Sequence, residues 1–359
     1  MKILFLEPFY GGSHKHVADS FAAHSSHEID ILSLPPRFWK WRMRGAALEF
    51  IRKIDKIAYY DLIFATDMMD LTDFKGLAGK DCPPIYLYFH ENQLSYPLGP
   101  HEKRDFHLGF TNIISALAAD RVFFNSHFHR DDFFKAARTL IKQMPDFRPT
   151  WMIEEIQDKT QILYPGFDFN GDPGTLKESG LDRPLIIWNH RWEYDKNPAE
   201  FFNVLRAVKE KGILFYLAVM GEQYEIIPDE FEQAKIDFKD ELLVYGYLSS
   251  SDEYRQWLSK GTVVVSTAIQ ENFGIAVMEA IASGCFPLLP DRLSYPELIP
   301  GEFKEKVIYS DEAQLVEKLE QVLTHPEKIV SDRLDLSVHA AGFSWKTLVK
   351  QWDTALEVF

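Results

Sequence analysis

The 359-residue sequence predicts an α/β fold made of two domains. Its length suggests about two domains of ordinary size. Short apolar strands alternate with helical patterns along the chain, which is typical of parallel sheets covered by helices. Several of these strands run directly into polar or glycine-rich loops. Because open α/β sheets bind ligands at the carboxyl ends of their strands, these loops are the candidate functional sites.

Composition limits the functions to consider. With 46% hydrophobic and 26% charged residues, the chain can bury two cores. Residues 1–150 carry 19 Lys and Arg against 18 Asp and Glu, whereas the remainder carries 20 against 36. We therefore expect any polyanion to bind the amino-terminal part. No apolar run approaches the about 20 residues of a membrane span, and Cys82 and Cys285 are isolated. A cytoplasmic protein without stable membrane insertion is expected.

The first strand, expected over residues 2–6, ends in a glycine-rich loop that contains Gly11 and Gly12, and a helix is expected over 15–23. The two glycines permit positive φ and a close approach of the backbone to a ligand. Further elements are predicted from apolar runs and helical spacing. They are strands over 29–34, 61–67, 84–89 and 121–124, a helix over 110–119, and a helix opened by residues 125–133.

The strand over 84–89 ends in four polar residues, which are His90, Glu91, Asn92 and Gln93. A buried strand normally ends in a simple turn, so this polar strand end indicates a binding site.

Bases and aromatic residues alternate over residues 37–44. Arg42 and Arg44 are able to pair with phosphates while Trp and Phe side chains stack on bases, as in RNA binding. The same stretch, continued to residue 60, would also suit a basic amphipathic helix on an anionic membrane. A third interpretation is an ordinary helix that packs Trp39 inward.

In the second half, the strand predicted over 185–188 ends in a loop that contains Arg191 and Lys196, and a helix is expected to begin at Pro198 with Asn197 as its cap. The alternation then continues. Predicted elements are a helix over 201–209, strands over 214–220 and 242–248, and a helix over 254–259.

Residues 263–287 predict a buried strand of three valines, a short loop, and a helix that runs from Phe273 and stops at Gly284. Glu271 lies on the loop, and Glu279 follows eight residues later, about two turns into the helix. The first helical amides, expected near Asn272, lack intrahelical acceptors and would suit a phosphate.

The Glu271 and Glu279 pair, with Arg191 and Lys196 five residues apart, resembles the retaining nucleotide-sugar glycosyltransferases of GT-B fold. The resemblance implies two Rossmann-like, doubly wound domains that face each other across a cleft. Residues 1–168 would form the acceptor domain, with the helix 345–359 crossing back onto it, and residues 169–344 the donor domain. The Pro-Gly-x-Asp sequence within residues 162–168 would be the crossing.

The resemblance also assigns roles to residues. His90 and Glu271 would contact the transferred sugar, Glu279 the ribose, and Arg191 and Lys196 the diphosphate. The expected catalytic residues are His90, Glu271, Arg191 and Lys196. The expected donor-binding residues are Gly11, Gly12, Arg191, Lys196, Tyr247, Asn272, Phe273, Gly274 and Glu279.

Three stretches, residues 7–14, 89–97 and 124–129, look like the tRNA-queuosine α-mannosyltransferase family. That resemblance implies GDP-mannose as donor and the cyclopentenediol of queuosine in tRNA as acceptor. No Asp-x-Asp triplet is present, so we expect no metal and no tightly bound cofactor. The oligomeric state is left open. The expected acceptor-binding residues are His14, Arg42, Arg44, Glu91, Asn92, Gln93 and Ser126, with Lys103, Arg104 and Arg130 as further candidates for tRNA contacts.

Two alternatives remain. One keeps the GT-B fold but uses another nucleotide sugar and a lipid or small metabolite as acceptor. The other makes the chain a non-catalytic RNA-binding module, although such a module would have no use for the four residues that suit the donor.

Overall fold

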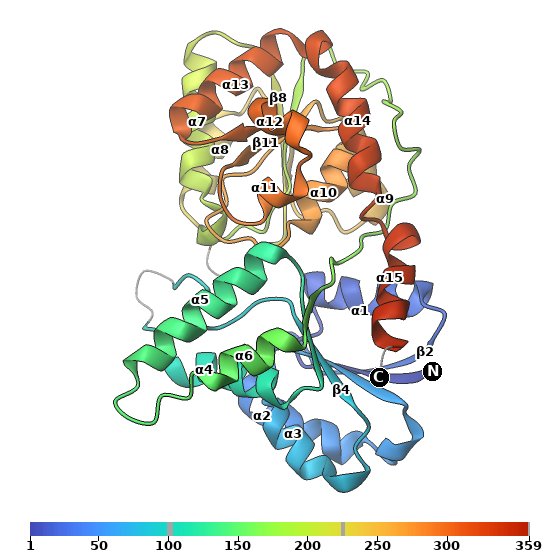
Figure 1. Cartoon of the computed structure of the whole chain (residues 1–359). Helices are drawn as coiled ribbons and strands as arrows, with labels where there is room; N and C mark the ends of the chain where they lie inside the picture. Colours follow the sequence, from blue (N-terminus) through green and yellow to red (C-terminus); the bar gives the residue numbers. More distant parts are fainter. Residues whose placement is uncertain (99–102, 224–226, 358–359) are drawn as a thin grey trace. The chain divides into compact units, whose positions relative to one another are not determined.

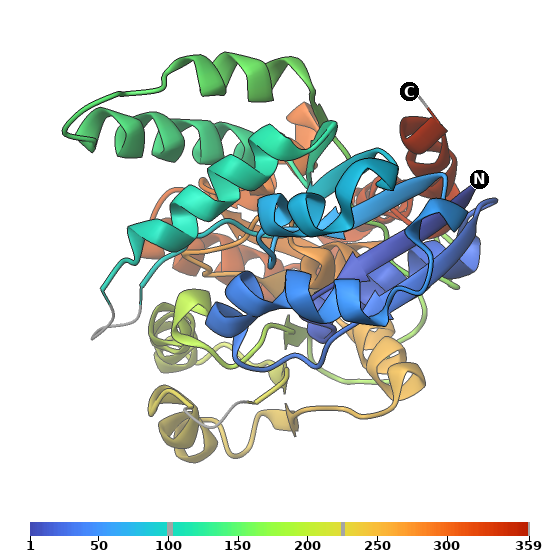
Figure 2. The ribbon, with the colours of Figure 1, turned by 90° about the horizontal axis from the view of Figure 1, so that it is seen from below.

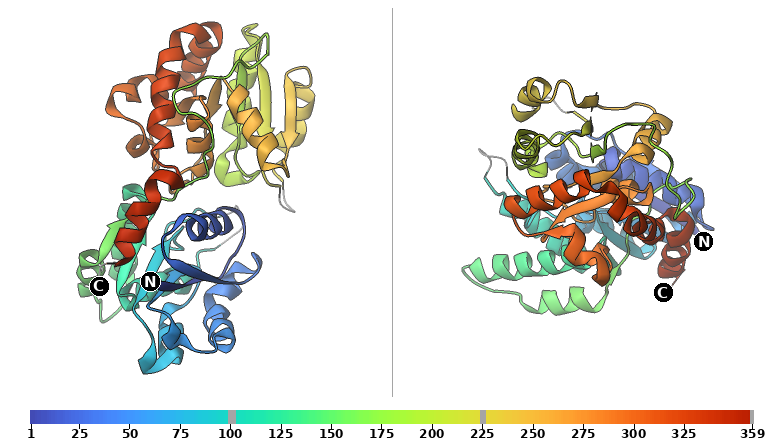
Figure 3. Two further views of the ribbon diagram at one scale, coloured as in Figure 1. Left: turned by 90° about the vertical axis from the view of Figure 1, so that its right-hand side faces the viewer. Right: turned by 90° about the horizontal axis from the view of Figure 1, so that it is seen from above.

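The computed structural model describes residues 1–98, 103–223 and 227–357, which form two compact units. The first unit comprises residues 1–168 and 345–359, and the second comprises residues 169–344. Within the described residues, each unit contains one parallel sheet of six strands. Figure 1 shows helices on both faces of each sheet, and Figure 3 shows the same layers from two other directions.

The first sheet has the strand order β2-β1-β3-β4-β5-β6. The elements of the first unit are β1 (Lys2–Glu7), α1 (Gly12–His24), β2 (Glu28–Ser33), α2 (Trp39–Lys53), η1 (Ile57–Tyr59), β3 (Leu62–Thr66), α3 (Leu71–Ala78), η2 (Gly79–Asp81), β4 (Ile85–Phe89), α4 (Phe106–Ala118), β5 (Arg121–Phe124), α5 (His127–Gln143), α6 (Trp151–Asp158), β6 (Thr160–Ile162) and α15 (Trp345–Glu357).

Successive residues of β1 point to opposite faces of this sheet, as expected for a strand buried on both sides. Leu4 and Leu6 join the core beneath α2, α3 and α4. Phe5 contacts Phe64 of β3, whose ring also contacts Phe21 of α1 and Trp352 of α15. Because of this alternation, different helices pack on the two faces of the sheet.

Figure 2 shows α5 and α6 side by side at the edge of this unit.

The second sheet has the order β12-β11-β10-β7-β8-β9. The elements of the second unit are β7 (Leu185–Trp188), η3 (Tyr194–Lys196), α7 (Pro198–Glu210), β8 (Tyr216–Met220), α8 (Glu230–Asp237), β9 (Leu242–Gly246), α9 (Ser251–Lys260), β10 (Val263–Val265), α10 (Ile275–Ala282), β11 (Phe286–Pro290), α11 (Tyr295–Leu298), η4 (Gly301–Phe303), α12 (Lys304–Val307), β12 (Ile308–Tyr309), α13 (Glu312–Thr324), η5 (Pro326–Ile329) and α14 (Val330–Ala341).

Several helices begin earlier or later than the apolar spacing predicted. The helix expected over 15–23 begins at Gly12, so the glycine pair is at its amino terminus and not in a separate loop. The helix expected over 110–119 begins at Phe106, because the Asp105 carboxylate accepts a hydrogen bond from the His107 amide and caps the helix there. Periodicity does not register the residues at these boundaries, which are a capping aspartate before α4 and a glycine before α1.

Asn197 occupies the predicted cap position of α7, but its side chain does not cap the helix. Its backbone is left-handed, with φ of 52°, and its side-chain amide instead donates to Glu200 at 2.5 Å. The expected capping interaction is therefore wrong, although Pro198 does begin the helix.

The carboxy-terminal helix α15 belongs to the first unit, where it packs on α1 and on residues 164–168. The Trp345 amide donates to the Phe167 carbonyl at 3.0 Å, and the Trp352 indole donates to the Tyr164 carbonyl at 2.8 Å. A Cβ atom at Gly166 would lie 2.5 Å from the Trp345 ring. Glycine is therefore required there for the helix to pack this closely.

Asp353 is the polar anchor of α15. Its carboxylate accepts hydrogen bonds from the Ser25 hydroxyl (2.5 Å), the Ser26 hydroxyl (2.7 Å) and the Ser26 amide (2.9 Å). Burial alone would raise the pKa of the Asp353 carboxyl, but these hydrogen bonds lower it below its ordinary value. The carboxylate therefore stabilises the folded state when it is charged.

We predict that Asp353→Asn lowers the free energy of unfolding of the first unit by about 1–3 kcal/mol at neutral pH, because an amide cannot accept all three bonds. Since the folded-state pKa lies below the unfolded one, this contribution is complete above about pH 4 and is lost as pH falls through the folded pKa. Urea melts at several pH values test this. A stability difference from wild type that does not shrink in acid, or an equal loss in the exposed control Asp55→Asn, would contradict the assignment.

Candidate active site

The second unit holds a buried lysine where two neighbouring strands end. Lys196 lies in η3 after β7, is 6% exposed, and donates to the Gln270 carbonyl at 2.7 Å. Its ammonium also lies 3.3 Å from the Glu271 carboxylate, which follows β10. Because β7 and β10 are adjacent in the sheet, the two predicted residues come together at its carboxyl edge.

Asp195 is a member of this site that the sequence did not reveal. Its carboxylate is 1% exposed and lies 3.2 Å from the Lys196 ammonium. Burial lowers the pKa of Lys196, but the Glu271 and Asp195 carboxylates raise it to above its ordinary value overall. Lys196 is therefore positively charged at neutral pH. We name Lys196, Asp195 and Glu271 together the Lys196 cluster. The only signal of Asp195 in the sequence is its position directly before Lys196.

The loop before α10 differs from the prediction in one respect. The helix begins at Ile275 and not near Phe273, because Gly274 has φ of +96° and occupies the cap position. The first amides without intrahelical partners are therefore those of residues 275–277, two to three residues later than expected. Asn272 and Phe273 are buried in the preceding loop, where the Phe273 carbonyl accepts a hydrogen bond from Ser294. A helix amino terminus still adjoins Glu271, which favours an anion there.

Glu279 is held within α10 by two residues that the sequence analysis missed. The Tyr254 hydroxyl donates to the Glu279 carboxylate at 3.1 Å, and the Asn189 side chain donates to the Tyr254 oxygen at 2.9 Å. Burial, followed by the Glu279 charge, raises the pKa of Tyr254 well above its ordinary value. Tyr254 therefore stays protonated and fixes the carboxylate.

The remaining predicted donor residues of this unit lie nearer the surface. Arg191 has a side chain 42% exposed and lies 3.1 Å from the Glu193 carboxylate. Tyr247, just after β9, is 66% exposed. An exposed arginine and aromatic ring are available to a ligand at little desolvation cost.

In the first unit, Glu7 at the end of β1 brings two histidines together. His14 Nδ1 lies 3.2 Å from Glu7 Oε1, and His90 Nε2 lies 3.8 Å from Glu7 Oε2. Burial lowers the pKa of His14, but the Glu7 charge outweighs this and raises it to about 9. Burial, and then the charge of His14, lowers the pKa of His90 well below its ordinary value. Gly11 and Gly12 begin α1 directly beside this cluster.

Two predicted acceptor-binding residues have structural roles. The Asn92 oxygen accepts hydrogen bonds from the Leu94 and Ser95 amides, each at 3.1 Å, and so forms the turn after β4. The Ser126 hydroxyl caps α5 by accepting a hydrogen bond from the His129 amide at 3.0 Å. Polar residues at strand ends suit both ligands and caps, and sequence alone does not separate the two.

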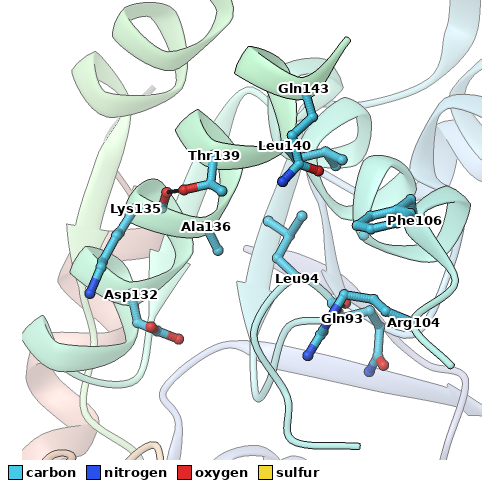
Figure 4. A pocket seen from close by; sticks show the side chains of 11 residues that line it. Gln93, Leu94, Arg104, Phe106, Asp132, Lys135, Ala136, Thr139, Leu140 and Gln143 are labelled. Carbon is cyan, nitrogen blue, oxygen red and sulfur yellow. Dashed lines mark hydrogen bonds between the residues drawn. The ribbon is translucent and has the colours of Figure 1, made fainter. Parts of the chain in front are cut away.

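Glu91 and Gln93 contact each other, since the Gln93 side-chain amide donates to the Glu91 carboxylate at 2.9 Å. Beside Gln93 lies a pocket of about 370 Å³, between the loop after β4 and helices α4 and α5. Figure 4 shows Arg104 and Gln93 on one side of this pocket and Asp132 and Lys135 on another.

Arg104 supports the loop, because its guanidinium donates to the carbonyls of Gln93 (3.1 Å) and Tyr96 (2.9 Å).

The basic and aromatic segment forms the start of α2. Trp41 is 73% exposed, whereas Trp39 packs partly against a small core around Met43. Arg42 donates to the Pro35 carbonyl at 3.3 Å, and Arg44 lies 4.0 Å from Asp70. The segment therefore combines an inward tryptophan with an exposed, basic surface. Among the described residues, no helix has the length and apolar character needed to cross a membrane.

Comparisons with known proteins identify the family. A family model described as "tRNA-queuosine alpha-mannosyltransferase N-terminal" matches residues 2–167, and one described as "Glycosyl transferases group 1" matches residues 177–334. A relative from Drosophila melanogaster, named "tRNA-queuosine alpha-mannosyltransferase", is 36% identical over 99% of this chain and 96% of its own length. A relative from Xanthomonas oryzae pv. oryzae, named "GDP-mannose:cellobiosyl-diphosphopolyprenol alpha-mannosyltransferase", is 21% identical over 92% of this chain and 82% of its own length.

Solved structures show the same fold. The crystal structure of Anabaena Alr3699/HepE in complex with UDP matches with a TM-score of 0.70 and 15% identity, over 99% of both chains. Sucrose-phosphate synthase from Thermosynechococcus elongatus matches with a TM-score of 0.74 and 14% identity, over 99% of this chain and 98% of that one. The predicted GT-B fold is thus confirmed. With these matches along nearly its whole length, the chain belongs to the tRNA-queuosine α-mannosyltransferase family and is a glycosyltransferase.

Proposed function

We propose that the protein transfers mannose from GDP-mannose to the cyclopentenediol of queuosine in tRNA, with retention of the sugar's configuration. The observation that carries this proposal is the 36% identity over 99% of the chain to a protein of that name. The GDP-mannose donor is further supported by the name of the Xanthomonas relative. That relative is named for a lipid-linked acceptor, which keeps a lipid as the second candidate acceptor.

The second unit is proposed to bind the donor. As the bond from mannose C1 to the β-phosphate oxygen breaks, negative charge grows on that phosphate. The Lys196 ammonium, the Arg191 guanidinium and the first amides of α10 would stabilise it, without a metal at the pyrophosphate. Glu279, fixed by Tyr254, would accept hydrogen bonds from the ribose hydroxyls. Tyr247 would contact the nucleotide base.

Glu271 and His90 are proposed to contact the transferred mannose. A new bond forms from the acceptor hydroxyl oxygen to C1, and the hydroxyl proton passes to the departing phosphate, so that no covalent enzyme intermediate is required. The nearness of Glu271 to Lys196 supports this assignment, because it ties the sugar-binding carboxylate to the phosphate-binding cation.

The first unit is proposed to bind the acceptor. His14 lies in the first turn of α1, and Glu91 and Gln93 follow β4 at the carboxyl edge of the sheet. Gly11 and Gly12, at the start of α1, stay proposed donor contacts. The exposed surface at the start of α2, with Arg42, Arg44 and Trp41, is proposed to contact tRNA phosphates and bases.

Incubation with GDP-mannose and queuosine-containing tRNA, followed by nucleoside mass spectrometry, tests the proposed reaction. We expect one hexose on queuosine and none on tRNA that carries guanosine at that position. Transfer to a polyprenol-linked acceptor, with none to the tRNA, would replace the proposal by its lipid alternative.

Arg191→Ala is predicted to lower kcat for mannosyl transfer roughly 100- to 1000-fold, because one donor to the growing phosphate charge is removed. Arg183→Ala is the matched control, since Arg183 is similarly exposed and precedes β7 while Arg191 follows it. Steady-state kinetics with saturating tRNA measures the effect. Equal rates for the two variants would remove Arg191 from the donor site.

The double variant Arg42→Ala and Arg44→Ala is predicted to weaken tRNA binding and to reduce the slope of log affinity against log salt by about 1.4–1.8. GDP-mannose hydrolysis without tRNA should be unchanged. The control is Arg52→Ala with Lys53→Ala at the other end of α2, where Arg52 and Lys53 pair with Glu49. If both double variants bind tRNA with the same slope, the contacts lie elsewhere.

A further inference from the structure

Three ligand-type side chains meet at the carboxyl edge of the first sheet. Glu7 ends β1, His14 lies in the first turn of α1, and His90 follows β4. Each offers one atom to a group in which all atoms lie within 4.8 Å of one another. Asp67, which follows β3 between the other two strands, lies beside them. The topology thus gathers residues that lie up to 83 positions apart in sequence.

The distances suit the coordination sphere of a metal ion. Bonds of about 2.0–2.1 Å from imidazole nitrogen and carboxylate oxygen to zinc place neighbouring ligand atoms about 3.4 Å apart in a tetrahedral site. The separations of His14 and His90 from the two Glu7 oxygens, 3.2 and 3.8 Å, lie on either side of this value. The two rings lie 4.0 Å apart at 31° to each other, and both present a nitrogen to the same carboxylate.

The buried carboxylates also require a partner. Glu7 Oε1 accepts a hydrogen bond from the Phe9 amide, but Glu7 Oε2 has no hydrogen-bond partner among the described residues. Asp67 Oδ1 accepts from the His90 amide at 2.8 Å, while Asp67 Oδ2 likewise has none there. Both side chains are fully buried. Buried carboxylate oxygens of this kind are costly unless an ion or a water contacts them, and two neighbouring negative groups favour a cation.

We propose that Glu7, His14 and His90 bind one divalent transition-metal ion of the zinc class. Two imidazole nitrogens and one carboxylate oxygen favour such an ion over Mg²⁺ or Ca²⁺, which prefer oxygen ligands alone. Three protein ligands leave one position open, as in catalytic zinc sites. Asp67 adds a second buried carboxylate beside the ion. This departs from the expectation that the protein uses no metal, which rested on the absence of an Asp-x-Asp triplet and of a cysteine or histidine cluster along the sequence.

The role of the ion in the reaction rests on the proposed function. A divalent ion at the ends of β1 and β4, beside Gly11 and Gly12, would polarise a hydroxyl of the acceptor bound at its open position. Its role would then be with the acceptor and with the mannose that His90 is proposed to contact, separate from the donor phosphates that the Lys196 cluster is proposed to bind.

A cobalt titration tests the site on the full-length protein without a polyhistidine tag, after dialysis against a chelator. We expect one Co²⁺ per chain, with d–d absorption of a four- or five-coordinate ion that Zn²⁺ displaces. Glu7→Gln and His14→Ala should each weaken binding by roughly 10- to 100-fold or more. His24→Ala is the matched control on α1, because His24 pairs with Ser20 and Asp168 away from the cluster.

Wild-type protein that is folded by circular dichroism but binds no Co²⁺ would overturn the inference. Unchanged affinity in Glu7→Gln, which keeps the shape of the side chain, would do the same even if His14→Ala failed to fold. The titration needs neither GDP-mannose nor tRNA. Absent mannosyl transfer with cobalt bound would therefore refute the proposed function and leave the site standing. Full transfer by metal-free protein would refute the ion's use in the reaction, and the titration would still decide whether the site exists.

Discussion

The proposed donor site of the second unit depends on a buried cation. Placing the Lys196 ammonium at 6% exposure is costly unless negative groups surround it, and Asp195, Glu271 and the Gln270 carbonyl do so. With two carboxylates around one ammonium, the cluster by itself is not positive. The phosphate groups of a donor would therefore also rely on Arg191 and on the amino terminus of α10. A lysine held in this way is already positioned before a ligand arrives, which is the arrangement that stabilises developing charge most effectively.

Parallel sheet topology explains why both units collect their polar residues at one edge. In the second sheet β7 and β10 are neighbours, so the loops after them place Lys196 against Glu271. In the first sheet β1, β3 and β4 lie side by side, and the residues at their carboxyl ends, Glu7, Asp67 and His90, come together. Helices of the two units contribute in different ways. α10 presents its amino terminus beside Glu271, whereas α15 contributes packing through Trp345 and Trp352.

The sequence was sufficient for the parts of the structure that depend on local patterns. Runs such as Val263–Val265 identified buried strands. The family resemblance assigned Lys196 and Glu271 to one site, and the structure places their charged groups 3.3 Å apart. Roles that depend on hydrogen bonding in three dimensions were not predictable. Asn92 and Ser126 resemble ligand-binding residues in sequence but cap a turn and a helix.

Residues that act on another side chain were also missed. The roles of Tyr254 and Asp195 follow only from their positions in the fold, where they contact Glu279 and Lys196. The pairing of Glu7 with two histidines likewise follows from strand order, which no spacing along the chain reveals.

We infer that the Lys196 cluster and α10 bind the donor pyrophosphate. A crystal structure with GDP would show whether they do. We expect pyrophosphate oxygens within hydrogen-bond distance of Lys196 Nζ, the Arg191 guanidinium and at least one of the first α10 amides, with the ribose on Glu279. A pyrophosphate bound away from Lys196, with the ammonium still contacting only Asp195, Gln270 and Glu271, would contradict it.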